Sequence, residues 1–191
     1  TPAATIAYQS PNACNLCHAD QTPQWADEHV RSWHERDYQK PMLQRAGLID
    51  AARKADWTAL PEMLAAITAP DREEIYANSL IRLLRPCEDE RKWPALLAAA
   101  KDSSPLIRAT TAEALGDRLD PGNLAALIEL AGDDYRLVRI RAAAALAPVD
   151  PRMLVGEARA RLSRAVEELK ESMQARPDDA AAHYNLGNFF M

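Results

Sequence analysis

Cys14, Cys17 and His18 are the side chains whose types and spacing most plainly allow chemistry, because they form the sequence Cys-x-x-Cys-His. Two thiols three residues apart on one helical turn can add to the two vinyl groups of a haem, and the adjacent imidazole then reaches the iron. Covalent attachment lets a short segment hold haem without a large pocket. The spacing therefore predicts haem c, with Cys14 and Cys17 as the attachment residues and His18 as the proximal iron ligand.

Trp25, His29 and Trp33 follow at intervals of four residues, which places them on one stripe of a helix. We expect that helix to begin at Thr22-Pro23, a capping residue followed by proline at the first helical position, and to run to about residue 38. Two indoles beside an imidazole could pack on a haem, with His29 as the distal ligand. Alternatively, the tryptophan pair buries the helix against the first repeat, with His29 at its edge.

The same cysteines also allow a zinc interpretation, because the spacing C-x2-C-x11-H-x4-H is made by Cys14, Cys17, His29 and His34. Gln21 and Ala26 stand where a zinc finger needs an aromatic residue and a leucine. The two histidines are roughly 140° apart around a helix, which is poor for joint coordination. A zinc site and an inert or redox-active cysteine pair remain alternatives to haem, and either would leave a non-catalytic interaction scaffold.

Composition favours an all-helical protein, since the chain is 48% apolar, rich in Leu and Ala, and poor in Gly. With a net charge of -5 and no cluster of basic and aromatic residues, nucleic-acid binding is not expected. No apolar run is long enough to cross a bilayer. No phosphate loop, nucleophile elbow or Ser/His/Asp grouping is evident, so the sequence indicates no catalytic site in this segment.

The middle of the chain repeats itself with a period of 31 residues, which is typical of stacked supersecondary units. The repeating positions include Asp71, Asp102 and Asp133, and also Leu84, Leu115 and Leu146. We therefore predict helix pairs at 58–68 with 71–84, 90–100 with 103–116, and 121–131 with 134–147. Residues 1–12 are expected to be an extended arm, 42–56 a helix, and 154–175 a long charged helix.

Two of the repeats resemble HEAT-like repeats through the sequences Asp102-Ser-Ser-Pro105-Leu-Ile-Arg108 and Asp133-Asp-Tyr-Arg136-Leu-Val-Arg139. The resemblance implies a helical solenoid over residues 58–148 and is looser for the first pair, in which Arg82 does not occupy the register of Arg108. The segment from Ala180 to Asn188 looks like the first helix of a tetratricopeptide repeat. Both resemblances imply protein partners bound through the repeats.

Residues 11–38, with their Cys-x-x-Cys-His motif followed by Trp25 and Trp33, are similar to the last motif of multihaem c-type cytochromes that continue into such repeats. The resemblance implies a periplasmic or otherwise exported location, further haem motifs upstream, and an oxidoreductase role for a longer protein. We expect three segments: a haem-attachment segment with the first helix over 1–41, the HEAT-like solenoid over 42–150, and a linker helix with a partial tetratricopeptide repeat over 151–191.

Overall fold

The computed structural model describes residues 1–175 and 178–190, and all its regular elements over those residues are helices. The chain divides into two compact units, Thr1–Met63 and Leu64–Met191. The first contains the Cys-x-x-Cys-His motif and the second contains the 31-residue repeats. The predicted all-α fold with a helical-repeat solenoid is confirmed.

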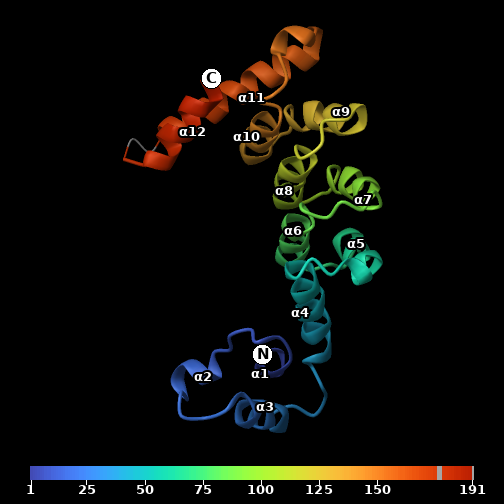
Figure 1. Cartoon of the computed structure of the whole chain (residues 1–191), viewed down its shortest axis with the longest axis vertical. Coiled ribbons are helices and arrows are strands. Elements are labelled where there is room, and N and C mark those ends of the chain that lie inside the picture. Colours follow the sequence, from blue (N-terminus) through green and yellow to red (C-terminus); the bar gives the residue numbers. More distant parts are fainter. Residues whose placement is uncertain (176–177, 191) are drawn as a thin grey trace. The chain divides into compact units, whose positions relative to one another are not determined.

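The first unit is built from α1 (Pro2–Tyr8), α2 (Cys14–Cys17), α3 (Pro23–Ser32), α4 (Lys40–Arg53) and the short 3-10 turn η1 (Trp57–Ala59). Helix α1 packs against both α3 and α4, while α2 contacts α3 (Figure 1). The stripe of α3 that carries Trp25, His29 and Trp33 thus belongs to a helix that packs against α1 and contacts α2.

The extended arm expected over residues 1–12 is wrong, since α1 occupies most of it. Thr1 caps this helix by accepting a hydrogen bond from the backbone N–H of Ala4 at 3.3 Å, and Pro2 sits at the first helical position. Proline is favoured there because its missing N–H has no helical partner to lose. The same signal that correctly marked Thr22-Pro23 as a helix start was thus present at Thr1-Pro2.

Helix α3 ends at Ser32, earlier than the predicted residue 38. The residues that follow turn the chain back: Gln39 donates its side-chain amide to Asp27 Oδ1 on α3 at 2.8 Å, and its backbone N–H to Asp37 Oδ1 at 3.0 Å. The polar run after Trp33 has no apolar face to bury, so these loop hydrogen bonds outweigh continued helix.

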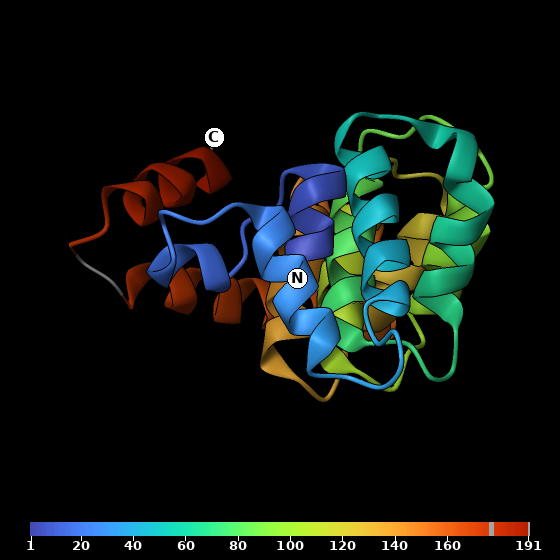
Figure 2. The ribbon, with the colours of Figure 1, turned by 90° about the horizontal axis from the view of Figure 1, so that it is seen from below.

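The second unit stacks helices in two layers. Helices α6 (Glu74–Leu83), α8 (Pro105–Leu115) and α10 (Arg136–Ala145) pack successively on one another, while α7 (Lys92–Ala99) contacts α8 and α9 (Pro121–Leu130) contacts both α8 and α10. Figure 1 shows these layers side by side, and Figure 2 views the green and yellow helices of successive repeats behind one another. Helix α5 (Leu60–Thr68) spans the division between the units.

The 31-residue period is explained by burial. Leu84, Leu115 and Leu146 lie at the C-terminal ends of α6, α8 and α10, and each is at most 1% exposed. Burial of each leucine side chain away from water stabilises the fold by about 1.5–3 kcal/mol. The regular spacing in the sequence therefore records one packed layer per repeat.

A row of ion pairs links the repeats, and we call it the arginine ladder. It consists of Arg72 with Asp102, Arg108 with Asp133, and Arg139 with Glu168. Arg108 and Arg139 also donate to backbone carbonyls of the preceding turn, at 2.7 Å to Asp102 O and 2.7 Å to Asp133 O. In the first pair, where the sequence has no arginine in this register, Arg72 supplies the guanidinium from the turn itself.

The last part of the unit departs from the 31-residue register. After the 3-10 turn η2 (Pro151–Met153), α11 (Gly156–Gln174) packs on α10 and receives the ladder at Glu168. Helix α12 (Ala180–Phe190) contacts α11, and it contains the segment that resembles a tetratricopeptide repeat. That resemblance and the three-segment division remain predictions.

Candidate functional site

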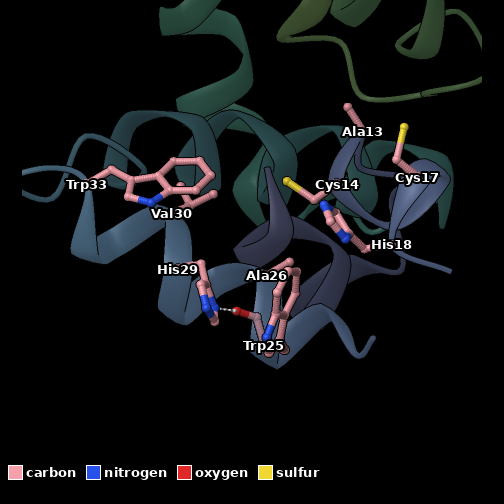
Figure 3. Close-up of a pocket in the computed structure, with 9 residues that line it drawn as sticks. All are labelled: Ala13, Cys14, Cys17, His18, Trp25, Ala26, His29, Val30 and Trp33. Carbon is pink, nitrogen blue, oxygen red and sulfur yellow. Dashed lines mark hydrogen bonds between the residues drawn. The ribbon is translucent and has the colours of Figure 1, made fainter. Parts of the chain in front are cut away.

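The first unit contains a cavity of about 320 Å³ at the Cys-x-x-Cys-His motif (Figure 3). It is open to solvent on one side and extends along the stripe of α3. Its lining residues are Ala13, Cys14, Cys17, His18, Trp25, Ala26, His29, Val30 and Trp33. The structure thus brings together all six residues that the sequence nominated for haem attachment, ligation or packing.

The motif itself is a single helical turn, closed by a hydrogen bond from the His18 N–H to the Cys14 carbonyl at 2.8 Å. All three cysteines of the chain are free thiols; Cys14 is half-buried, Cys17 is exposed, and Cys87 is buried in the second unit. In Figure 3 the two motif thiols point in different directions, with the Cys17 thiol pointing away from the rings of Trp25 and His29.

Two asparagines fix this turn, and the sequence reasoning missed them. Asn12 accepts a hydrogen bond from the Asn15 N–H at 3.1 Å and donates to Thr5 Oγ1 on α1 at 2.8 Å. Asn15 donates in turn to the Gln21 carbonyl at 2.9 Å. Asn12 is only 8% exposed. An asparagine just before a short helical turn is a recognised capping signal, and that signal could have identified Asn12.

Helix α3 supplies the opposite wall because Thr22 fixes its start, accepting a hydrogen bond from the Trp25 N–H at 3.1 Å. Ala26 and Val30, which are 1% and 6% exposed, are the residues that α3 buries. Trp33 lines the cavity but is 69% exposed. The alternative in which both tryptophans bury this helix therefore does not hold for Trp33.

Three aromatic rings from the motif and α3 are in contact. The indole of Trp25 lies 5.0 Å from the His18 ring and 4.2 Å from the His29 ring, between centroids. Interplanar angles of 50° and 35° make both contacts tilted. Trp25 thus touches the imidazoles of both nominated iron ligands.

The orientation of His29 is set by its own helix, through a 2.8 Å hydrogen bond between Nδ1 and the Trp25 carbonyl. A carbonyl oxygen can only accept, so Nδ1 carries the proton and Nε2 of the neutral ring keeps its lone pair. A histidine whose Nδ1–H is bound to a carbonyl is the usual arrangement for metal ligation through Nε2.

An acidic anchor lies behind the cavity on α3. Burial acts to raise the pKa of Asp27, but hydrogen bonds from Arg31 and Gln39 outweigh it and hold that pKa below its ordinary value. Asp27 stays ionised at neutral pH, pairs with Arg31 on the same helix, and accepts a hydrogen bond from Gln39 in the loop before α4. The Asp27 carboxylate thus stabilises the position of α3. The residues that line the cavity include no Asp, Glu, Lys or Arg.

The zinc spacing is not assembled in the same way. The ring of His34 contacts that of Tyr38, with centroids 4.3 Å apart, and is outside the lining of the cavity that Cys14, Cys17 and His29 share. Over residues 1–175 and 178–190, no group of three or more His, Cys, Asp or Glu side chains is placed to hold a metal ion. His34, the fourth residue of the alternative zinc set, therefore belongs to a different local structure from the other three.

Among the described helices, none combines the length and apolar character needed to span a bilayer.

No curated protein and no solved structure gives a significant match to the chain. A family model described as HEAT repeats matches residues 60–147 and, in a second register, residues 93–184. These matches together span well over half of the chain and cover the stacked helices and arginine ladder of the second unit. The chain belongs to the HEAT-repeat family.

Proposed function

We propose that this chain carries one covalently attached haem c on Cys14 and Cys17, takes part in electron transfer through it, and uses its HEAT repeats as a scaffold for protein partners. The observation that carries the proposal is that Cys14, Cys17 and His18 line one apolar cavity together with two tryptophans, and that both thiols are free. The sequence motif alone would not require such a surrounding.

The residues present fit a haem c by their chemistry. Each thiol would add across one vinyl group, forming a carbon–sulfur bond at one vinyl carbon while the thiol proton goes to the other. The His18 imidazole would ligate the iron, and the indoles of Trp25 and Trp33 offer flat apolar surface to the macrocycle. The 320 Å³ cavity is open to solvent beside the motif, so a group larger than the cavity could bind there with part of its surface exposed.

We propose His29 as the second residue that would hold the haem iron. It lines the same cavity as His18, and the Trp25 carbonyl leaves its Nε2 unprotonated. Bound haem would supply one-electron oxidation and reduction, and two histidines holding the iron would favour electron transfer over binding of a substrate to it. In this chain, Ala26 and Val30 would exclude water from one edge, while Asn12 and Asn15 hold the attachment turn in place.

The HEAT repeats supply the scaffold part of the function, because such repeats commonly mediate protein interactions. We further propose that the segment at α12 begins a tetratricopeptide repeat and that the chain works in an exported, periplasmic compartment, where haem is attached to this motif. Any oxidoreductase activity would depend on the haem and not on the repeats.

Expression of the exported chain together with a haem-attachment system tests the proposal. We expect a red protein that keeps its haem after denaturation and acid–acetone extraction, and that shows a sharp α band when reduced. Cys14→Ser with Cys17→Ser should lose the covalent haem, whereas Cys87→Ala, a cysteine outside the motif, should retain it. A colourless wild-type protein with Cys14 and Cys17 recovered as free thiols would refute the haem function.

A further inference from the structure

Three apolar side chains recur with the repeat period on the second helix of each pair, and we call them the apolar row. Ile75, Leu106 and Leu137 are each the second residue of their helix, in α6, α8 and α10. These helices pack on one another in succession, so the three positions follow one another across the stack (Figure 1). Ile75 is 59% and Leu137 is 47% exposed, while Leu106 is half-buried. Neighbouring exposed apolar side chains with a polar rim are typical of a binding surface.

Charged side chains flank the apolar row toward the C-terminal ends of the helices. Arg82, Glu113 and Arg141 follow the three apolar residues by seven, seven and four positions, spacings that stay on one helix face. Arg82 and Arg141 both pair with Glu113, at 3.7 and 2.8 Å, and both guanidiniums remain exposed. Two cations beside one carboxylate give this side of the row an excess of positive charge.

An aromatic ring borders the row on its other side. Tyr135 precedes the first residue of α10 and is exposed. Exposed aromatic side chains of this kind are the usual surface on which proline rings pack. The nearby charges are engaged within the protein, since Glu74 accepts a hydrogen bond from Ser104 and Arg136 pairs with Glu171 at 3.2 Å. The row therefore has a basic side and an aromatic side.

The spacing of the row selects the conformation of a ligand that follows it. Packed neighbouring helices are about 8–10 Å apart, and the row has one apolar side chain per helix. A polyproline II segment turns the same side outward at every third residue, about 9.3 Å along the chain. A β-strand does so about every 6.7 Å, and an amphipathic helix brings its apolar residues about 5–6 Å apart. Only the polyproline II repeat matches the helix spacing.

We propose, as a refinement of the scaffold function proposed above, that this face binds an acidic polyproline II segment of a partner protein. Three residues complete one turn of that helix, so a repeated Leu-Pro-Glu sequence presents each residue type on its own side. The leucines lie on the apolar row, the glutamates face Arg82 and Arg141, and the prolines face Tyr135. Because proline holds the segment extended before it binds, little conformational entropy is lost on docking.

Fluorescence anisotropy on the full chain, with a labelled peptide of three Leu-Pro-Glu repeats, tests the proposal. We expect saturable binding by the wild type. A peptide of the same composition with its leucines placed next to one another should bind at least about tenfold more weakly, because one leucine at most then meets the row. A peptide with lysine in place of glutamate should also bind more weakly, through repulsion from the two arginines.

Variants of the apolar row locate the site. Ile75→Ser with Leu137→Ser should weaken binding of the Leu-Pro-Glu peptide by about tenfold or more, because two apolar contacts are lost. Both side chains are exposed, so the helical signal and the melting temperature should stay near those of the wild type. Met153→Ser is the matched control, because this exposed methionine of the same unit belongs to η2 and not to the row.

Variants of the basic side test the charge separately and do not depend on the apolar changes. Arg82→Gln with Arg141→Gln should weaken binding about two- to fivefold at low salt and remove most of its salt dependence. Arg152→Gln is the control, since this arginine pairs with Asp150 outside the row. It should leave both the affinity and its salt dependence unchanged.

Several results would overturn the proposal. They are a wild type that does not bind the Leu-Pro-Glu peptide at millimolar concentration, equal affinity for the peptide with adjacent leucines, or equal losses in Met153→Ser and in the Ile75 and Leu137 variant. A peptide that becomes helical on binding, by circular dichroism, would also overturn it. Haem takes no part in the titration. A colourless protein that binds the peptide would therefore refute the haem function alone, and a haem-loaded protein that does not bind it would refute this surface alone.

Discussion

The guanidinium of Arg108 binds the carboxylate of Asp133 through two hydrogen bonds, at 2.7 and 2.9 Å, although 25 residues separate them in the chain. Both side chains are nearly buried, at 13% and 10% exposure. A paired, hydrogen-bonded charge in such a place is costly to leave without its partner. This rung of the arginine ladder therefore couples one helix pair to the next.

Asp133→Asn or Arg108→Met should destabilise the repeat unit by about 3 kcal/mol, because each change leaves one buried charge unpaired. The double variant should cost less than the sum of the two, and urea unfolding followed by circular dichroism measures all three. The control is Arg91→Gln, whose ion pair with Asp89 is at the surface, with 60% and 31% exposure. That variant should change stability by less than about 0.5 kcal/mol. Equal losses at both sites would contradict the buried coupling.

The ladder should make the repeat unit sensitive to acid. Hydrogen bonding from Arg139 holds the pKa of Glu168 below its usual 4.5, and Arg108 holds that of Asp133 below 3.8 against the effect of burial. Since these folded-state pKa values are depressed, the stabilisation is complete above about pH 4.5 and is lost as the pH falls through the lowered values. Thermal melts between pH 7 and 2 should show this loss.

Glu168→Gln supplies the comparison for the acid experiment. It should lower the melting temperature at pH 7 and flatten the decline below pH 4.5, because the amide does not titrate. Melting temperatures of wild type and variant should therefore converge as the pH falls. A constant difference between them over the whole range would show that the ionisation of Glu168 does not contribute.

Gly116 permits a close approach between α8 and α10. A Cβ atom at this position would lie 2.8 Å from the Cβ of Ala145 and 3.2 Å from its Cα, so the helices would have to separate. Gly116→Ala should destabilise the unit by about 1–3 kcal/mol, as overpacking of a tight interface does. Gly122→Ala, where the nearest atom is at an ordinary 3.4 Å, is the matched control and should be close to neutral. Chemical denaturation of both variants distinguishes a packing effect from a general effect of alanine.

Replacing both motif cysteines should leave the repeat unit folded. Cys14 and Cys17 belong to the compact unit of residues 1–63, whereas the ladder and the leucine layers belong to residues 64–191. Cys14→Ser with Cys17→Ser should therefore keep the helical signal and the main melting transition of the cofactor-free chain. A large loss of helical signal in the double variant would show that the motif turn stabilises the repeats.

The repeats were predictable because a period of 31 residues combines three signals: the turn aspartates, the buried leucines and the helix-favouring composition. The predicted pairs contain the observed helices from α5 to α10. The sequence could not reveal that Arg72 replaces the missing arginine of the first pair, or that Glu168 accepts the last rung, because both lie out of register. Side-chain reach in three dimensions, and not spacing, decides those partners.

For the candidate site, the six nominated residues do share one cavity, since the motif turn and the stripe of α3 lie on neighbouring elements. The errors came from short polar contacts. The predicted arm ignored the Thr1 cap, and the overlong α3 ignored the bonds of Gln39 to Asp27 and Asp37. Equally, no spacing rule could show the indole of Trp25 against both imidazoles, because that contact depends on side-chain rotation.

The arginine ladder has a consequence for the length of the array. Arg108 and Arg139 occupy equivalent positions in successive repeats, and so do Asp102 and Asp133. Removing residues 103–133 would therefore join Asp102 to Asp134 and take out both Arg108 and Asp133. Arg72 would stay paired with Asp102, and Arg139 with Glu168. Each buried charge would still meet an opposite one. A whole unit could thus be removed without redesign of its neighbours, so the length of the scaffold can change while the unit that contains the Cys-x-x-Cys-His motif stays the same.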